Sequence, residues 1–268
     1  MSLSTKQLSI SQPAISVIVI TLNEAKRIGN LLQDLSAQRY RNFEVVLVDS
    51  NSDDNTSTIA QTFMDKLPKL TVHVMPKRGV SLGRNTGASL ASHERLLFLD
   101  ADVRLDSDFL VKAVEQLNQK PADVAGVYMN AQGLPLHYRL GYKLFNTGIF
   151  MTQFFSPTAV GACIFSTRHA HQLLHGFDET IKLCEDCDYV NRAKKLATFR
   201  MLPISFRFDP RRLQQDGFVK TGIKYLHANL YRFFIGELRN DKIRYDFGHY
   251  KKLYSQAHIS QQLSDMSN

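Results

Sequence analysis

Two aspartates, Asp100 and Asp102, follow an apolar run that ends at Leu99, with only Ala101 between them. Their carboxylate oxygens are ligands of the kind that Mg²⁺ and Mn²⁺ bind, and such a metal could bridge the phosphates of a nucleotide diphosphate. Short acidic pairs at the ends of strands can also cap the next helix, a role open to Asp106. The pair alone therefore leaves a metal site and a structural role both open.

Small polar and acidic residues also follow two other apolar runs. They are Thr21, Asn23 and Glu24 after the run 15–20, and the eight residues 49–56 after the run 43–48. In open α/β sheets, ligands bind beyond the carboxyl ends of the strands. We therefore expect these polar groups and the aspartate pair to line one ligand site.

The elements that would position these groups follow from the apolar pattern. The runs 15–20 and 43–48 are rich in β-branched residues and too short to span a membrane, which predicts buried parallel strands. Residues 24–38 between them carry apolar side chains at helical spacing, which predicts a helix. The two strands and this helix would form a β-α-β unit. Further helices are predicted near 54–65 and 81–91, and further strands near 70–75 and 95–99. The predicted fold class is α/β, an open and mostly parallel sheet flanked by helices.

Composition narrows the class of protein. The chain has 268 residues, of which 44% are hydrophobic and 22% charged, and this excludes wholesale disorder and a polytopic membrane protein. Its three cysteines form no even disulfide framework, and no signal peptide is recognisable, so we expect a reducing, cytoplasmic setting. Cys184 and Cys187 match only half of a zinc site.

The segment 144–167 contains 24 uncharged residues, enough to cross a bilayer. Polar residues, Pro157 and Gly161 interrupt it, so we predict instead a buried helix followed by a strand at 159–166. An aromatic cluster lies in and before this segment and is more typical of a core than of an acceptor groove. Its members are Tyr138, Tyr142, Phe145, Phe150, Phe154 and Phe155.

The positive charge of the chain is concentrated near its end. The net charge is +8, and from Arg200 onward there are twelve Lys and Arg against six Asp and Glu. Beyond Gln214 the pattern predicts a basic amphipathic helix. Such a helix could pack on the main domain or contact an anionic membrane surface, and the sequence favours neither.

The order of several motifs resembles that of the family 2 glycosyltransferases. The matching segments are 18–24 (IVITLNE), 47–56 (LVDSNSDDNT), 83–87 (GRNTG), 99–102 (LDAD), 161–162 (GA), 175–179 (HGFDE) and 185–188 (EDCD). The resemblance covers roughly residues 15–212. It implies a GT-A fold with a nucleotide-binding sheet, inversion at the anomeric carbon, and a need for Mn²⁺ or Mg²⁺. The pattern beyond Gln214 adds a C-terminal helical extension to this predicted fold.

The resemblance also implies roles for individual residues. Thr21, Asn23 and Glu24 would line the nucleotide site, Asp49 and Ser50 the base or ribose side, Arg84 the nucleotide or its phosphates, Asp100 the ribose, Asp102 the metal, and Asp186 would be the general base beside Glu185. A carboxylate base would remove the proton of the acceptor hydroxyl as it attacks, while the metal stabilises the departing diphosphate. Glu185 and Asp186 would also suit a helix N-terminus.

Other positions refine this interpretation. Ser50 stands where many relatives carry an aspartate, so UDP, GDP or dTDP donors all remain open. The chain has no tryptophan and lacks the Gln-x-x-Arg-Trp element of processive synthases, which indicates transfer of one sugar per encounter. Gly161 and Ala162 could let an acceptor approach the backbone or form a tight strand. Arg211 and Arg212 resemble a doubled arginine of small nonprocessive members, and could grip a phosphate or lie solvated at the surface.

We therefore predict a metal-dependent, inverting glycosyltransferase acting on a lipid-linked or glycan acceptor, peripheral on the inner face of the cytoplasmic membrane. The predicted organisation is a flexible tail at 1–13, a nucleotide-sugar-binding half at 14–130, an acceptor-binding half at 131–212, and a basic amphipathic extension at 213–268. A nucleotidyltransferase is the alternative enzyme, but 21–24 is not a Gly-rich phosphate loop. A basic module without catalysis, binding nucleic acid or membrane, is the alternative outside enzymes, and we expect no nucleic acid partner.

Overall fold

The computed structural model describes residues 12–181 and 183–208. The predicted basic extension at 213–268, nearly all of the predicted tail at 1–13, and both Arg211 and Arg212 lie outside these residues. Within the described ranges, no helix combines the length and the apolar character needed to cross a membrane.

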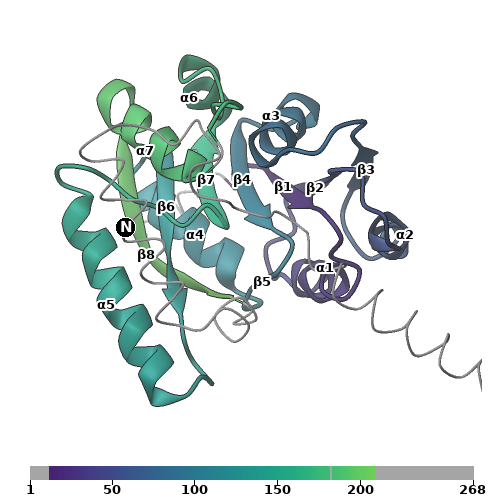
Figure 1. Cartoon of the computed structure of the whole chain (residues 1–268), viewed down its shortest axis with the longest axis horizontal. Helices are drawn as coiled ribbons and strands as arrows, with labels where there is room; N and C mark the ends of the chain where they lie inside the picture. The colour runs from purple at the N-terminus through teal and green to yellow at the C-terminus, as the bar shows by residue number, and fades with distance from the viewer. Residues whose placement is uncertain (1–11, 182, 209–268) are drawn as a thin grey trace, which may run out of the picture.

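In the described part of the chain, eight strands form one sheet with the order β3-β2-β1-β4-β7-β6-β8-β5 (Figure 1). The strands are β1 (Ile15–Thr21), β2 (Phe43–Asp49), β3 (Leu70–Val74), β4 (Arg95–Asp100), β5 (Val103–Arg104), β6 (Val124–Asn130), β7 (Cys163–Thr167) and β8 (Phe199–Phe208). The strands β1 to β4 are mutually parallel, and β6 is parallel to β8. The strand β7 runs antiparallel between β4 and β6 and joins the two parallel groups.

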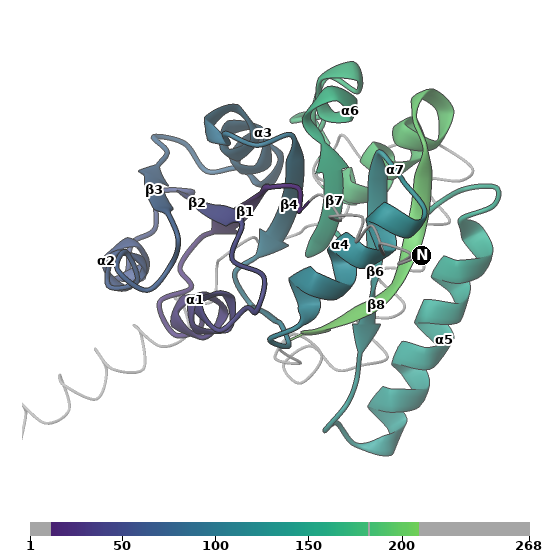
Figure 2. The same cartoon turned by 180° about the vertical axis from the view of Figure 1, so that it is seen from behind.

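Helices cover both faces of the sheet. They are α1 (Ile28–Ser36), α2 (Thr56–Gln61), α3 (Val80–Leu90), α4 (Phe109–Gln119), α5 (Leu136–Thr152), α6 (Arg168–Leu173) and α7 (Glu185–Leu196). One apolar core joins α1, α2 and α4 to one face of the sheet, and a second core joins α3, α6 and α7 to the other. Figures 1 and 2 show these two helical layers from opposite sides. The predicted α/β class with an open, mostly parallel sheet is confirmed.

The central strands are buried on both sides, which explains their unbroken apolar sequence. In β1, Val17 and Val19 belong to the core beneath α1, whereas Ile18 belongs to the core beneath α3. The helix α3 packs closely against β1 because it carries Gly87 at the contact. A Cβ atom on Gly87 would lie 2.3 Å from a methyl carbon of Ile18. A larger residue there would push α3 away from the strands that end at the polar loops.

The structure corrects the prediction of a buried helix between 144 and 167. The helix is α5, which begins at Leu136 and buries only Tyr142 and Ile149. It packs against β6 and lies at the lateral edge of the molecule (Figures 1 and 2). Tyr142 and Ile149 are seven apart, so a single narrow stripe of the helix faces the protein. Most of the aromatic cluster is exposed, with Phe154 and Phe155 at 68% and 69%, so its interpretation as core is wrong for these residues.

Candidate active site

The ends of β1 and β2 place buried polar groups side by side. Thr21 and Asp49 are paired in the register of the two strands, and both side chains are buried. The Asp49 carboxylate accepts hydrogen bonds from the Ser52 amide at 3.0 Å, from the Ser52 hydroxyl at 2.6 Å, and from the Ser57 hydroxyl. Within the described chain, the buried Thr21 hydroxyl has no hydrogen-bond partner. An unsatisfied buried hydroxyl is costly, which makes Thr21 suited to a ligand contact.

The loops after β1 and β2 are tied to each other through the predicted nucleotide-site residues. The Asn23 amide donates to the Ser52 hydroxyl at 2.9 Å, and the Asn23 side-chain oxygen accepts from the Asp53 amide at 2.8 Å. The Glu24 amide donates to the Thr56 hydroxyl at 2.9 Å. Asn23 has a φ of 57°, a left-handed conformation that asparagine tolerates better than most residues. The two loops therefore form one polar rim.

Arg84 of α3 connects three segments that are far apart in the sequence. Its guanidinium donates to Glu185 Oε1 at 2.7 Å, to Asp100 Oδ1 at 3.1 Å and to the Gly161 carbonyl at 3.1 Å. The side chain is only 2% exposed. Burial works against its charge, but the carboxylates of Asp100, Glu185 and Asp186 outweigh burial and raise the pKa of Arg84. Arg84 thus holds the end of β4 and the start of α7 together.

Asp186 lies beside this arginine in the first turn of α7. Its Oδ2 atom accepts from the Gly161 amide at 2.7 Å, and its Oδ1 atom accepts from the Cys187 amide at 2.8 Å. Burial and the adjacent Glu185 carboxylate raise the pKa of Asp186 to about 6, although Arg84 acts in the opposite direction. A carboxylate with this pKa is ionised near neutral pH and can still accept a proton efficiently.

Gly161 is required by the close approach of Asp186. A Cβ atom at this position would lie 2.8 Å from Asp186 Oδ2 and 3.1 Å from Arg84 Nη2. The next residue, Ala162, accepts a hydrogen bond from the Asp100 amide at 3.1 Å, which fixes the end of β4 beside the Gly-Ala pair. The small residues at 161–162 therefore bring Asp100 and Asp186 to one place.

Hydrogen bonds join the motif at 83–87 directly to the motif at 175–179. The Asn85 side-chain oxygen accepts from the Phe177 amide at 2.8 Å, and its nitrogen donates to the Phe177 carbonyl and to Glu179, each at 2.9 Å. The turn between α6 and α7 is thereby fixed to α3. Arg84, the neighbour of Asn85, therefore reaches α7 from a fixed position.

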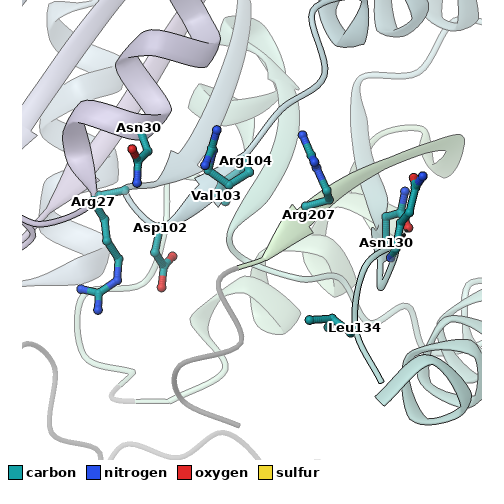
Figure 3. Close-up of a pocket in the computed structure, with 10 residues that line it drawn as sticks. Arg27, Asn30, Asp102, Val103, Arg104, Asn130, Leu134 and Arg207 are labelled. Atoms are coloured by element: carbon teal, nitrogen blue, oxygen red, sulfur yellow. Dashed lines mark hydrogen bonds between the residues drawn. The ribbon is translucent and has the colours of Figure 1, made fainter. Parts of the chain in front are cut away.

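Asp102 faces a different neighbourhood from Asp100. It lines a cavity of about 260 Å³, shown in Figure 3, whereas Asp100 points to Arg84. The cavity is lined by Arg27, Asn30, Ala101, Asp102, Val103, Arg104, Asn130, Gln132, Leu134 and Arg207. In Figure 3, the side chains of Arg27 and Asp102 project toward the same side. Each of its three arginines is paired with a carboxylate, Arg27 with Glu24, Arg104 with Asp34 and Arg207 with Asp106, so their positive charge is already partly balanced within the protein.

The protein side chains near Asp102 fit a metal site in which substrate phosphates and water supply the remaining ligands. Among residues 12–181 and 183–208, no group of three or more His, Cys, Asp and Glu could hold a metal ion. Mg²⁺ in particular commonly binds through one or two carboxylates, substrate phosphates and water rather than within an all-protein cage. A single carboxylate, Asp102, on a cavity rich in arginine fits this mode.

Sequence reasoning missed the other residues that line this cavity. Arg27 and Asn30 belong to the start of α1, and only their closeness to the predicted loop residue Glu24 signals them. Asn130 and Gln132 reach the cavity because β6 lies beside β8, an adjacency without a local sequence signal. Of the residues predicted from the sequence, the fold brings Asp100, Asp186, Glu185 and Arg84 together at one edge of the sheet.

A family model described as Glycosyl transferase family 2 matches residues 16–172, more than half of the chain. The chain belongs to glycosyl transferase family 2. Its membership confirms the resemblance drawn from the motifs, and the matched residues include the β1 and β2 loops, Arg84, both aspartates after β4, and Gly161.

Among its relatives, the chain is similar to two named glycosyltransferases from bacteria. It is 32% identical over 118 residues to glycosyltransferase GlyG of Streptococcus pneumoniae, covering 43% of this chain and 39% of that protein. It is 35% identical over 118 residues to the PGL/p-HBAD biosynthesis glycosyltransferase of Mycobacterium bovis, covering 43% of this chain and 46% of that protein. The match therefore spans less than half the length of these curated relatives.

Solved structures show that this family 2 chain has the GT-A fold. The mannosyltransferase PcManGT from Pyrobaculum calidifontis, in complex with GDP-Man and Mn²⁺, superposes with a TM-score of 0.65 at 20% identity, covering 94% of this chain and 81% of that chain. TarS from S. aureus, in complex with UDP-GlcNAc, superposes with a TM-score of 0.59 at 24% identity, covering 72% and 58% of the two chains.

Proposed function

We propose that this chain transfers one sugar, with inversion, from a nucleotide-sugar donor to a lipid-linked or glycan acceptor at the cytoplasmic face of a membrane. The observation that carries the proposal is the position of Asp186. Its carboxylate is held by the Gly161 amide, has a pKa of about 6, and is joined through Arg84 to Asp100 at the end of β4. This arrangement supports a base at Asp186 close to the proposed nucleotide-binding edge of the sheet.

Asp186 is the proposed general base. In a single displacement it takes the proton of the acceptor hydroxyl as that oxygen attacks the anomeric carbon, opposite the departing diphosphate. The Gly161 and Cys187 amides hold the carboxylate in place, and burial together with the Glu185 carboxylate keeps the pKa of Asp186 high enough to accept the proton. Mn²⁺ or Mg²⁺ held by Asp102 would supply positive charge to the leaving diphosphate.

The proposed donor site is the polar rim formed by the loops after β1 and β2. Thr21, Asn23, Glu24, Asp49 and Ser50 belong to this rim or to the strand ends below it. Two structural neighbours were solved with UDP-GlcNAc and with GDP-Man, and we therefore propose a donor of the UDP, GDP or dTDP type. Residues 14–130 would form the donor half and 131–212 the acceptor half of the domain.

A thermal-shift panel tests this proposal with the full chain. UDP-, GDP- and dTDP-sugars are added with and without Mn²⁺, and the matching donor is expected to raise the Tm by roughly 5–10 °C at a hundredfold excess over its Kd. No Tm increase with any of these donors would contradict the proposal.

The variant Asp102→Asn tests the metal site within the same panel. We expect it to bind the matching donor at least ten-fold more weakly in the presence of Mn²⁺, because one carboxylate ligand is lost. The matched control is Asp108→Asn, since Asp108 pairs with Lys112 away from the cavity. Equal Mn²⁺-dependent binding by Asp102→Asn and the control would remove the metal from the proposal.

A further inference from the structure

The outward face of α5 is apolar. Its exposed leucines and methionine, and the two phenylalanines after it, are Leu136 at 67%, Leu140 at 59%, Leu144 at 76%, Met151 at 60%, Phe154 at 68% and Phe155 at 69%. A surface helix normally turns its apolar side chains inward and its polar ones outward. The helix α5 buries the apolar Tyr142 and Ile149 but also turns Leu136, Leu140, Leu144 and Met151 toward the outside.

The geometry of the helix shows that this exposure follows a regular stripe. Tyr142 and Ile149 define the buried side of α5. Leu136, Leu140 and Leu144 are each four residues apart, so they lie on one stripe that points away from the buried side. Met151 lies on the same side of the helix, and Phe154 and Phe155 are exposed just beyond its end. We call this set the α5 apolar face and define it as Leu136, Leu140, Leu144, Met151, Phe154 and Phe155.

Positive charge flanks the α5 apolar face. Arg139 and Lys143 are exposed on the same helix, and no Asp or Glu occurs from residue 136 to residue 177. Figures 1 and 2 place α5 at the lateral edge of the molecule, on the opposite side from β3. An apolar stripe with basic neighbours is the pattern of helices that lie in the plane of a membrane interface.

We propose that the α5 apolar face docks this protein on an anionic lipid bilayer. Its apolar side chains enter the boundary between headgroups and acyl chains, while Arg139 and Lys143 contact lipid phosphates. Charge argues for this occupant over others. Residues 209–268 contain ten Lys and Arg against six Asp and Glu, and a second α5 face is basic as well, so both would bring like charges together.

The same helix borders a route to the candidate active site. A groove of about 1080 Å³ is lined by Arg139, Lys143 and Phe150 of α5, together with parts of β6 and β8. It shares Asn130 and Gln132 with the cavity that contains Asp102. Resting on the proposed function, this continuity lets a lipid-linked acceptor extend from the bilayer along α5 toward the donor.

Flotation of the full chain with vesicles tests the docking surface. The vesicles contain phosphatidylcholine alone or phosphatidylcholine mixed with phosphatidylglycerol, and the protein is expected to float with the mixture. The triple variant Leu136→Ser, Leu140→Ser, Leu144→Ser is expected to bind at least a hundred-fold more weakly, since each lost apolar contact counts for roughly ten-fold. The double variant Arg139→Gln, Lys143→Gln is expected to lose about five-fold for each removed charge.

The matched control replaces exposed leucines elsewhere. Leu90 at the end of α3 and Leu196 at the end of α7 are 43% and 57% exposed, and Leu90→Ser, Leu196→Ser should float like the wild type. Circular dichroism and the Tm of each variant confirm folding. Because flotation needs no donor or turnover, its failure leaves the nucleotide-sugar panel unaffected, and failure of that panel leaves the flotation result standing.

A fluorescence reporter gives a second readout. The chain contains no tryptophan, so Phe154→Trp introduces a single tryptophan on the α5 apolar face, excited selectively at wavelengths that tyrosine does not absorb, and Leu196→Trp is the control. We expect phosphatidylglycerol-containing vesicles to shift the emission of Phe154→Trp to shorter wavelength and to leave Leu196→Trp unchanged. An unshifted Phe154→Trp, or unaltered flotation of the triple leucine variant, would overturn the proposal. A dimer by light scattering that the triple variant converts to monomer would overturn it in favour of a second copy.

Discussion

The strand-end site and α5 depart from the usual distribution of side chains in opposite ways. At the site, Arg84 is buried among carboxylates, and Thr21 is buried with its hydroxyl unpaired within the described chain. At α5, leucines and phenylalanines are exposed. Scattered exposed apolar residues carry little information, whereas buried charges and large apolar patches indicate function. The comparison is the basis of our two proposals, a charged donor at the strand ends and an apolar partner at α5.

The two regions also differ in how they are held. Arg84 makes hydrogen bonds to Asp100, Gly161 and Glu185, so its surroundings are fixed by charged contacts across the fold. Removing one partner of a buried ion pair strongly destabilises the folded protein, because the other charge remains buried without a partner. The helix α5 depends on few contacts of its own, with two buried side chains. Substitutions should therefore affect function at the first region and surface binding at the second.

The largest expected effect comes from Asp186→Asn. We expect turnover to fall by about 10² to 10⁴-fold, because the base is lost, while donor binding is retained. Steady-state kinetics and donor thermal shifts on the same preparation measure the two properties. The control is Asp188→Asn, which lies on the same helix and pairs with Arg192. Wild-type turnover in Asp186→Asn would show that another group is the base.

Stability should separate the buried core beneath α1 from α5 almost as clearly. Leu31 of α1 is fully buried and Leu140 of α5 is 59% exposed. Leu31→Ala should lower the free energy of unfolding by about 2–5 kcal/mol, since it leaves a cavity. Leu140→Ala should change the free energy of unfolding by less than about 0.5 kcal/mol. Urea denaturation measures both, and a comparable loss in Leu140→Ala would mean that α5 is covered in solution.

A smaller effect is expected from one methyl group beside Asp186. Gly161→Ala should lower turnover by roughly 100-fold, because the new Cβ displaces the carboxylate and misplacing a catalytic group by about 1 Å has this cost. Gly148→Ala on α5 is the control, since a Cβ there meets no atom within 4 Å. If both variants turned over equally, the contact between residue 161 and Asp186 would not matter for catalysis.

The smallest expected effect is the change of kcat/KM with pH. The base acts when it is ionised, and its pKa is raised to about 6, so kcat/KM should fall about ten-fold per pH unit below pH 6 and level off above it. Donor affinity, measured by thermal shift over the same pH range, serves as the control. A fall of kcat/KM centred near the ordinary aspartate pKa of about 4 would place the base in a more exposed setting.

Much of the fold could be predicted from local pattern. The runs 15–20 and 43–48 became β1 and β2 with one further residue each, because strands buried on both faces need continuous apolar sequence. The helix predicted at 81–91 is α3, which spans Val80–Leu90. The same reasoning failed for α5, because an uncharged run has the same composition whether the protein or another partner covers it.

The candidate site was predictable only as a set of residue types. The motifs supplied Asp49, Arg84, Asp100 and Asp102, which lie within the residues 16–172 matched by the family model, and Asp186, which lies beyond them. They did not indicate that Arg84 pairs with Glu185, a residue 101 positions later in the chain. They also did not indicate that the two aspartates after β4 face different neighbours.

The sequence by itself determined the elements, their alternation and the chemistry available at the strand ends. Those properties depend on neighbouring residues, whose spacing fixes periodicity and charge. Only the tertiary structure decided which distant groups meet. The strand β7 runs antiparallel beside β4, and this places Gly161 and α7 against Asp100 and Arg84. Contacts of this kind depend on the order of strands in the sheet, which no local pattern specifies, and the same is true of the exposed side of α5.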